Sequence, residues 1–181
     1  MQDKDREILE SFKSDPEQAF RLMFDTYYMP LCVYVVQLAD SFTAAEDIVQ
    51  ETFCYFWEKR YYERVQGSLR GYLFEAVRHA TLLYLRKNRL VSMEELSEEP
   101  VEFPEEAVDQ EELARQEERL REAVGRLPRQ EAEAVRLVIM ESRRYREAAE
   151  RMNVSVNTLK SYLGRALKKL RKEHNLLLFF C

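Results

Sequence analysis

The chain has 181 residues, of which 46% are hydrophobic, and its 4 glycines and 5 prolines make a composition that fills a core and favours helices over sheets. Its net charge is −5 at pH 7, and its three widely spaced cysteines argue against a disulfide framework or a zinc site and indicate a reducing cytosol. Because the N-terminus has no apolar h-region and no run approaches the roughly 20 apolar residues of a membrane span, we expect a cytoplasmic protein without membrane insertion.

The N-terminal forty residues predict one long helix that a proline interrupts. Residues 1–13 are charged, and we expect them to be frayed or loosely helical. Asp15 and Pro16 are typical of an N-cap followed by proline at the first helical position. Apolar residues then recur at helical spacing as far as Leu38, and Pro30 within that pattern predicts a kink or a break into two helices.

The next predicted helix has one apolar face and one acidic face. Thr43 and Glu46 form a capping-box pattern at its start. The residues expected to point inward are Ala45, Ile48, Val49, Thr52, Phe53 and Phe56. The outward stripe comprises Asp47, Gln50, Glu51, Cys54 and Glu58, with Trp57 at its margin. Such stripes are usually only solvated, but a large aromatic side chain at the border is typical of a surface that binds a partner.

This helix carries a family resemblance. Residues 46–53, EDIVQETF, followed by Trp57, resemble the second helix of bacterial RNA polymerase sigma factors, specifically those of the small two-domain extracytoplasmic-function group. In that family the helix docks on the clamp of the largest subunit of core RNA polymerase. The resemblance therefore implies that Asp47, Gln50 and Glu51, with Trp57 beside them, contact the core enzyme. Ala44 departs from the family, which commonly has an acidic residue there.

Basic and aromatic residues alternate in the following segment. Residues 61–67 predict a loop and residues 68–89 a helix, with Leu69, Leu73, Ala76, Val77, Ala80, Leu83 and Tyr84 inward. The cations are Arg60, Arg64, Arg70, Arg78, Arg86, Lys87 and Arg89, and the aromatic residues are Tyr61, Tyr62, Tyr72 and Phe74. Cations beside exposed rings suit unpaired bases, because bases stack on rings while the charges follow the phosphates. The alternative is a basic helix with aromatic residues in its core.

The same segment is similar to the family element that reads and melts the minus-ten promoter element. By position, Tyr72, Arg78 and His79 fall where family members contact the opened non-template strand, and Arg64 and Arg70 join them as candidate minus-ten contacts. The family more often has Asn at the position of His79. The resemblance therefore does not transfer a base preference.

Residues 92–118 are dominated by carboxylates and interrupted by two prolines. Such a stretch cannot bury enough apolar surface to fold alone, so we expect a flexible linker in its first half and a helix from about residue 109 to residue 125. A solubilising spacer is the simplest function of an acidic linker. In sigma factors the equivalent linker threads the basic nucleic-acid channels of the polymerase.

The chain ends in a predicted helix-turn-helix. Asn153 is suited to the positive φ of a sharp turn, and Ser155 to the N-cap of the helix that follows. A short helix is expected before the turn, from the spacing of Tyr145, Ala148, Ala149 and Met152. The core face of the longer helix comprises Val156, Leu159, Leu163, Ala166, Leu167 and Leu170, and its opposite face is cationic. This arrangement is typical of a helix that enters the major groove of duplex DNA, although a basic helix alone is more often a solvated C-terminus.

Residues 127–172 resemble the fourth region of sigma factors, which reads the minus-thirty-five element as duplex. The candidate contacts are Asn157, Lys160, Ser161, Arg165 and Lys168. Arg165 suits a bidentate contact to guanine and Lys160 a phosphate contact. The apolar tail that follows is expected to pack on its own domain, with docking to an anti-sigma protein as the alternative.

The two rival functions are an enzyme and a stand-alone helix-turn-helix regulator. With only two histidines and no nucleophile elbow, phosphate loop or H-E-x-x-H motif, the chain is not expected to be an enzyme or to hold a metal or cofactor. A stand-alone helix-turn-helix regulator would share the C-terminal half, but it would not need residues 46–57 or the basic aromatic segment.

The sequence therefore predicts an all-α protein of two small helical domains joined by a flexible acidic linker. Residues 14–90 would form sigma region 2, residues 91–110 the linker and residues 111–175 the region 4 helix-turn-helix. The expected function is promoter-specific transcription initiation, with core RNA polymerase, promoter DNA and an anti-sigma factor as partners.

Overall fold

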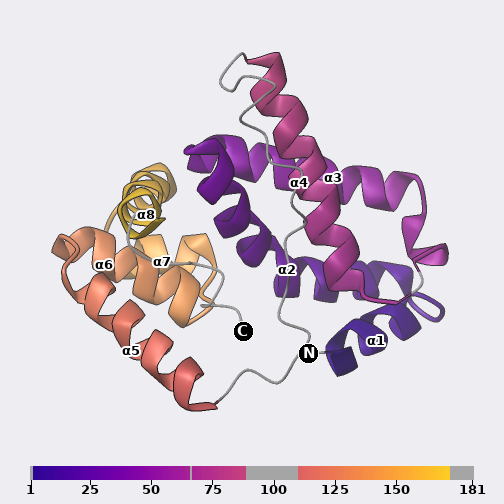
Figure 1. Ribbon diagram of the computed structural model, residues 1–181, viewed down its shortest axis with the longest axis horizontal. Helices are drawn as coiled ribbons and strands as arrows, with labels where there is room; N and C mark the ends of the chain where they lie inside the picture. Colours follow the sequence, from indigo (N-terminus) through magenta and orange to yellow (C-terminus); the bar gives the residue numbers. More distant parts are fainter. Residues whose placement is uncertain (1, 66, 89–109, 172–181) are drawn as a thin grey trace. The chain divides into compact units, whose positions relative to one another are not determined.

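The computed structural model describes residues 2–65, 67–88 and 110–171, which form only helices, turns and connecting segments (Figure 1). The all-α prediction is confirmed within these ranges. The chain separates into two compact units, the first containing α1 to α4 apart from the residues at the α2–α3 junction, and the second containing α5 to α8. The predicted linker at residues 91–110, apart from its last residue Gln110, and the apolar tail lie outside the described residues.

Helix α1 (Gln2–Ser11) is a regular helix that packs on α2 and α4. Ile8 and the following Phe12 are buried, and Asp5 is only 5% exposed. Of the two predicted states of this segment, the frayed one is therefore wrong and the helical one is confirmed. A charge-rich composition concealed one apolar edge, made by residues four apart, which is sufficient to anchor a short helix against a neighbouring core.

Helix α2 (Pro16–Ala39) is the central helix of the first unit. Its N-cap is as predicted, since the Asp15 carboxylate accepts a hydrogen bond from the Gln18 N–H at 3.0 Å. Of the kink or break predicted at Pro30, the break into two helices is wrong, because one helix continues through this buried proline. Proline removes one backbone hydrogen bond, and the buried side chains around it, including Leu31 and Val33, hold the helix together.

By length and composition alone, α2 is long and apolar enough to cross a membrane, which was not expected from the sequence. However, 50% of its most apolar window is buried inside the protein, as in a core helix.

Helix α3 (Phe42–Glu58) begins two residues before the predicted start, so Thr43 lies within the first turn and is not the N-cap of a capping box. Glu46 is buried, and its carboxylate accepts a hydrogen bond from the Tyr28 hydroxyl at 3.3 Å. The predicted inner face is confirmed except at Thr52, which is only half-buried. Phe53 lies in the core, with ring centroids 6.0 Å from Phe20 and 5.3 Å from Phe24.

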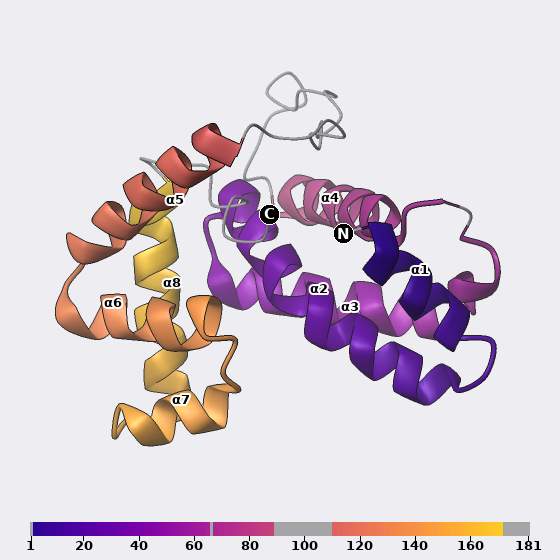
Figure 2. The same cartoon turned by 90° about the horizontal axis from the view of Figure 1, so that it is seen from below.

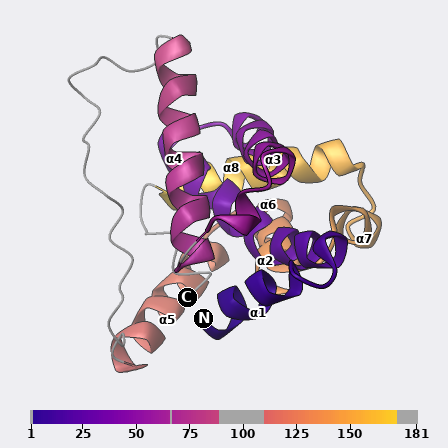
Figure 3. The same cartoon turned by 90° about the vertical axis from the view of Figure 1, so that its right-hand side faces the viewer.

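A short 3₁₀ helix, η1 (Tyr61–Glu63), precedes α4 (Leu69–Lys87), which Figure 3 shows as one uninterrupted helix. Ser68 is its N-cap, and its hydroxyl accepts a hydrogen bond from the Gly71 N–H at 3.0 Å. Leu83 was expected to point inward but is 50% exposed. The buried edge instead continues through Thr81 and Leu85, because the helix keeps a repeat of four residues against α2.

The second unit contains α5 (Gln110–Gly125), α6 (Arg129–Val135), the π-turn η2 (Arg136–Met140), α7 (Tyr145–Arg151) and α8 (Val156–Arg171). Figure 2 shows α8 running across α6 and α7, against which it packs. Its predicted core face is confirmed except at Val156, which is exposed. The buried residues of α8 are Leu159, Leu163, Ala166, Leu167 and Leu170.

The turn between α7 and α8 has the predicted geometry. Asn153 adopts φ 53°, in the left-handed region that a sharp change of direction requires. The Ser155 hydroxyl then accepts a hydrogen bond from the Thr158 N–H at 3.0 Å, which makes Ser155 the N-cap of α8.

Replacing Asn153 with alanine should lower the free energy of unfolding of the second unit by about 1 kcal/mol, because a Cβ without a local hydrogen-bonding group is disfavoured at positive φ. Asn153→Gly, which removes the steric penalty, should change it by less than about 0.5 kcal/mol. Native-state hydrogen exchange of the α8 amides measures both values. Equal protection in the alanine and glycine variants would contradict this account of the turn.

Candidate nucleic-acid and partner interface

The outer stripe of α3 is exposed as predicted. Its members Asp47, Gln50, Glu51, Cys54 and Glu58 all face away from the core. Trp57, at the margin, is half-buried and lies edge-on to Phe20, with ring centroids 5.1 Å apart. The stripe thus combines carboxylates and an amide with one fixed aromatic side chain, an arrangement suited to docking a partner.

Helix α2 orients one member of this stripe. The Gln50 amide donates a hydrogen bond to the Tyr28 hydroxyl at 3.2 Å, and that hydroxyl donates to Glu46. Burial raises the pKa of Tyr28, so the phenol stays protonated and keeps its donor role. Gln50 is therefore held in a defined position while its helix face remains accessible.

Three tyrosines form a continuous surface where α3, η1 and α4 meet, and we name Tyr55, Tyr61 and Tyr72 the tyrosine cluster. Ring centroids are 5.7 Å apart between Tyr55 and Tyr61 and 5.8 Å apart between Tyr61 and Tyr72. Tyr55 is 51% exposed. Two cations border the rings, with Lys59 5.8 Å from the Tyr55 centroid and Arg64 6.0 Å from that of Tyr61. Rings with adjacent cations suit unpaired bases.

The remaining aromatic residues of this segment do not join that surface. Phe74, expected among the exposed rings, is buried. Tyr62 stacks on Phe12, the residue that follows α1, with ring centroids 4.6 Å apart and an interplanar angle of 7°. The sequence did not indicate Tyr55, because it lies on the helix assigned to the acidic stripe.

The candidate minus-ten residues divide between two parts of α4. Arg64, Arg70 and Tyr72 surround its N-terminal end, where the Arg70 guanidinium lies 5.6 Å from the Phe74 ring centroid. Arg78 and His79 lie further along the helix. His79 is exposed, whereas the Arg78 side chain is only 16% exposed and pairs with Glu75 at 3.8 Å. The structure therefore does not gather all five residues into one cluster.

The candidate minus-thirty-five residues on α8 differ in their exposure and in their contacts. Asn157, Ser161 and Lys168 are exposed. The Lys160 ammonium lies 5.2 Å from the Tyr145 ring centroid on α7. Arg165 lies 5.1 Å from the ring of Tyr162 on its own helix.

Sequence reasoning missed Glu131, a carboxylate of α6 that is only 6% exposed. It accepts a hydrogen bond from the Lys169 ammonium at 2.8 Å and pairs with the Arg165 guanidinium at 3.4 Å. Nothing in the local sequence pattern distinguishes Glu131 from the exposed glutamates of this segment. The pairing matters because it engages the guanidinium of Arg165, the group predicted to contact a base.

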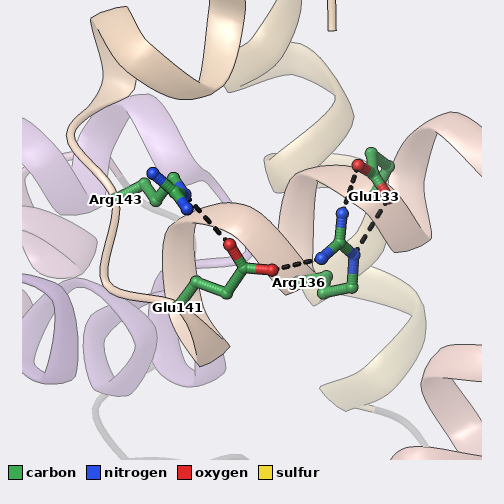
Figure 4. A network of polar contacts seen from close by, with 4 residues as sticks. All are labelled: Glu133, Arg136, Glu141 and Arg143. Carbon is green, nitrogen blue, oxygen red and sulfur yellow. Dashed lines mark hydrogen bonds and ion pairs between the residues drawn. The ribbon is translucent and has the colours of Figure 1, made fainter. Parts of the chain in front are cut away.

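An ion-pair network links α6 and η2 to the segment that precedes α7 (Figure 4). Arg136 donates two hydrogen bonds to Glu133, at 2.5 and 3.1 Å, and a third to Glu141, which also accepts one from Arg143 at 2.9 Å. The hydrogen bond from Arg136 lowers the pKa of Glu133, and that from Arg143 lowers the pKa of Glu141. The network thereby holds the turn at Ser142, which has φ 51°.

Two family models match the chain in order. Sigma-70 region 2 matches residues 23–91, and sigma-70 region 4 matches residues 117–170. Two relatives are named extracytoplasmic-function RNA polymerase sigma factors. RpoE of Cereibacter sphaeroides is 25% identical over 157 residues, covering 86% of each chain. SigX of Bacillus subtilis is 23% identical over 167 residues, covering 89% of this chain and 86% of the relative.

Solved structures give weaker likenesses. The complex of CnrH with the cytosolic domain of CnrY matches with a TM-score of 0.41 at 22% identity, covering 92% of this chain and 94% of that one. The complex of the sigma factor RpoE with the anti-sigma factor NepR from Bartonella quintana has a TM-score of 0.35 at 22% identity, with coverages of 84% and 94%. The two family models together cover well over half of the chain, and the sequence-based resemblance is confirmed. The chain belongs to the sigma-70 family, in its extracytoplasmic-function group of RNA polymerase sigma factors.

Proposed function

We propose that this chain works in the cytoplasm, where it binds core RNA polymerase through the outer stripe of α3 and directs initiation at a specific set of promoters. The observation that supports this most is the stripe itself, which is exposed while the opposite face of the same helix is locked into the core by Phe53. In this proposal residues 14–90 are region 2, residues 91–110 the linker and residues 111–175 region 4. Asp47, Gln50, Glu51 and Trp57 contact the polymerase clamp.

The first unit reads the opened minus-ten strand in this proposal. Tyr72 offers a half-exposed ring within the tyrosine cluster, and Arg64 and Arg70 supply charge for the phosphates. His79 adds a polar group further along α4. Arg78 is largely buried, so a direct contact to the strand requires it to leave Glu75.

The second unit reads the minus-thirty-five duplex with α8. Asn157 and Ser161 lie on the exposed face near the start of the helix, where recognition helices contact base edges. Lys160 and Lys168 suit phosphates, and Arg165 suits guanine. Because each contact set is small, binding becomes strong only when the polymerase tethers both units at one promoter.

Arg165→Ala should weaken binding of the holoenzyme to its promoter by about 1–3 kcal/mol and relax discrimination at one duplex base pair. Lys169→Ala is the matched control, since Lys169 shares Glu131 with Arg165 but is not predicted to contact a base. Promoter affinities measured for a set of minus-thirty-five variants distinguish the two effects. An equal loss on every sequence would make Arg165 a phosphate contact instead.

In-vitro transcription with core polymerase and a random-promoter library tests the proposed function. We expect the holoenzyme to select one promoter class that core polymerase alone does not use. The rival is a stand-alone regulator, which would bind a specific duplex operator tightly without polymerase and would not associate with the core enzyme.

An anti-sigma factor, common in this family, is the further partner we propose, and its addition should prevent core binding.

A further inference from the structure

The carboxylate of Asp5 in α1 joins three elements of the first unit. Its Oδ1 accepts a hydrogen bond from the Tyr27 hydroxyl of α2. Its Oδ2 accepts one from the Ser68 hydroxyl at 3.1 Å and one from the Arg70 N–H at 3.0 Å. A carboxylate this deeply buried is stable only when such donors replace water. The buried Asp5 carboxylate therefore requires these three donors, and each donor uses the carboxylate as its acceptor.

Two of these donors belong to the N-terminal end of α4. The first-turn amides of a helix lack partners within the helix. Ser68 satisfies the Gly71 N–H, and Asp5 satisfies that of Arg70 from a different helix. The carboxylate also lies at the positive end of the helix dipole. Asp5 thus completes the N-terminal cap of α4, the helix that presents Tyr72.

Phe12, the residue that follows α1, holds a second element of the same surface. Its ring stacks on Tyr62 of η1 and lies 6.2 Å, centroid to centroid, from Phe56 of α3. Tyr61, the neighbour of Tyr62, belongs to the tyrosine cluster. One short helix and the residue that follows it therefore fix both η1 and the start of α4, the two elements that place Tyr61 and Tyr72 side by side.

We propose that Asp5 is a positioning residue for promoter reading, acting through Ser68 and the Arg70 amide to hold Tyr72 in place for the opened strand. This inference rests on the proposed function of the first unit. It extends the promoter-reading surface to a helix that makes no predicted contact with DNA or polymerase.

The test compares Asp5→Asn, Ser68→Ala and Tyr27→Phe in the full chain assembled with core polymerase. The probe is a single-stranded oligonucleotide of the non-template minus-ten sequence selected from the promoter library. Asp5→Asn weakens the contacts to α4, and Ser68→Ala removes one of them. Tyr27→Phe removes only the donor from α2, so it controls for general destabilisation. Glu7→Ala, on the exposed side of α1, controls for changes in that helix.

We expect oligonucleotide affinity to fall at least fivefold for Asp5→Asn and Ser68→Ala, and less than twofold for Tyr27→Phe and Glu7→Ala, with core polymerase affinity unchanged in all four. An equal loss in Tyr27→Phe would reduce Asp5 to a general stabilising residue and overturn the proposal. Unchanged oligonucleotide binding in Asp5→Asn and Ser68→Ala would overturn it as well. Failure of the wild-type chain to bind core polymerase would instead refute the proposed function.

Discussion

Replacing Asp47 and Glu51 together with arginine should strongly weaken binding to core RNA polymerase. Both side chains are exposed on α3, one turn apart in the outer stripe. A docking surface that accepts carboxylates would then meet two cations, and a like-charge juxtaposition costs several kcal/mol. A loss of about 2–5 kcal/mol corresponds to roughly 30-fold or more in affinity. The single changes Asp47→Ala and Gln50→Ala should weaken binding less.

Affinity for core polymerase is measured by competition with a labelled wild-type chain, and thermal unfolding serves as the check on folding. The matched control is Glu17→Arg, a charge reversal at an exposed position of α2 outside the stripe. It should bind like the wild type. If the double variant binds normally, α3 does not contact the polymerase.

Phe53→Ala should destabilise the first unit by about 3–5 kcal/mol, a large part of the stability of a typical domain. Phe53 is buried on the inner face of α3 between the rings of Phe20 and Phe24, and its removal leaves a cavity that these aromatic side chains cannot easily fill. Trp57 is the only tryptophan in the chain and contacts Phe20, so its fluorescence follows unfolding of this unit.

Urea denaturation with that fluorescence measures the loss. Cys54→Ala, the next residue along α3 but on its exposed face, should change the free energy of unfolding by less than about 0.5 kcal/mol. A loss below about 1 kcal/mol for Phe53→Ala would mean that the aromatic core repacks around the missing ring. Together with the double arginine variant, Phe53→Ala and Cys54→Ala distinguish the face of α3 that stabilises the fold from the face that binds the polymerase.

Local patterns predicted the helix-turn-helix well. The core face of α8, the left-handed Asn153 and the Ser155 cap all follow from periodicity and short-range backbone chemistry. The outer stripe of α3 was predictable for the same reason. In these cases the residues that decide the structure are close together in the sequence.

Three residues were misjudged or missed because their partners are distant in the sequence. Asp5 was taken as part of a charged terminus that is frayed or loosely helical, because the donors that make its burial possible come from α2 and from the start of α4, up to 65 residues away. Glu131 was overlooked because its two cations lie on α8. Phe74 was read as exposed because Tyr34, whose ring centroid is 5.3 Å away, comes from another helix.

The shared pairing of Arg165 and Lys169 with Glu131 also affects how salt should act on duplex binding. Each phosphate that a protein neutralises releases about 0.9 of a condensed counterion, so the slope of log affinity against log salt counts phosphate contacts. Arg165 and Lys169 are already partly neutralised, because they share the Glu131 carboxylate. The ionic-strength dependence of minus-thirty-five binding should therefore be shallower than the number of lysines and arginines on this helix suggests, leaving a larger share of the recognition energy to the base edges.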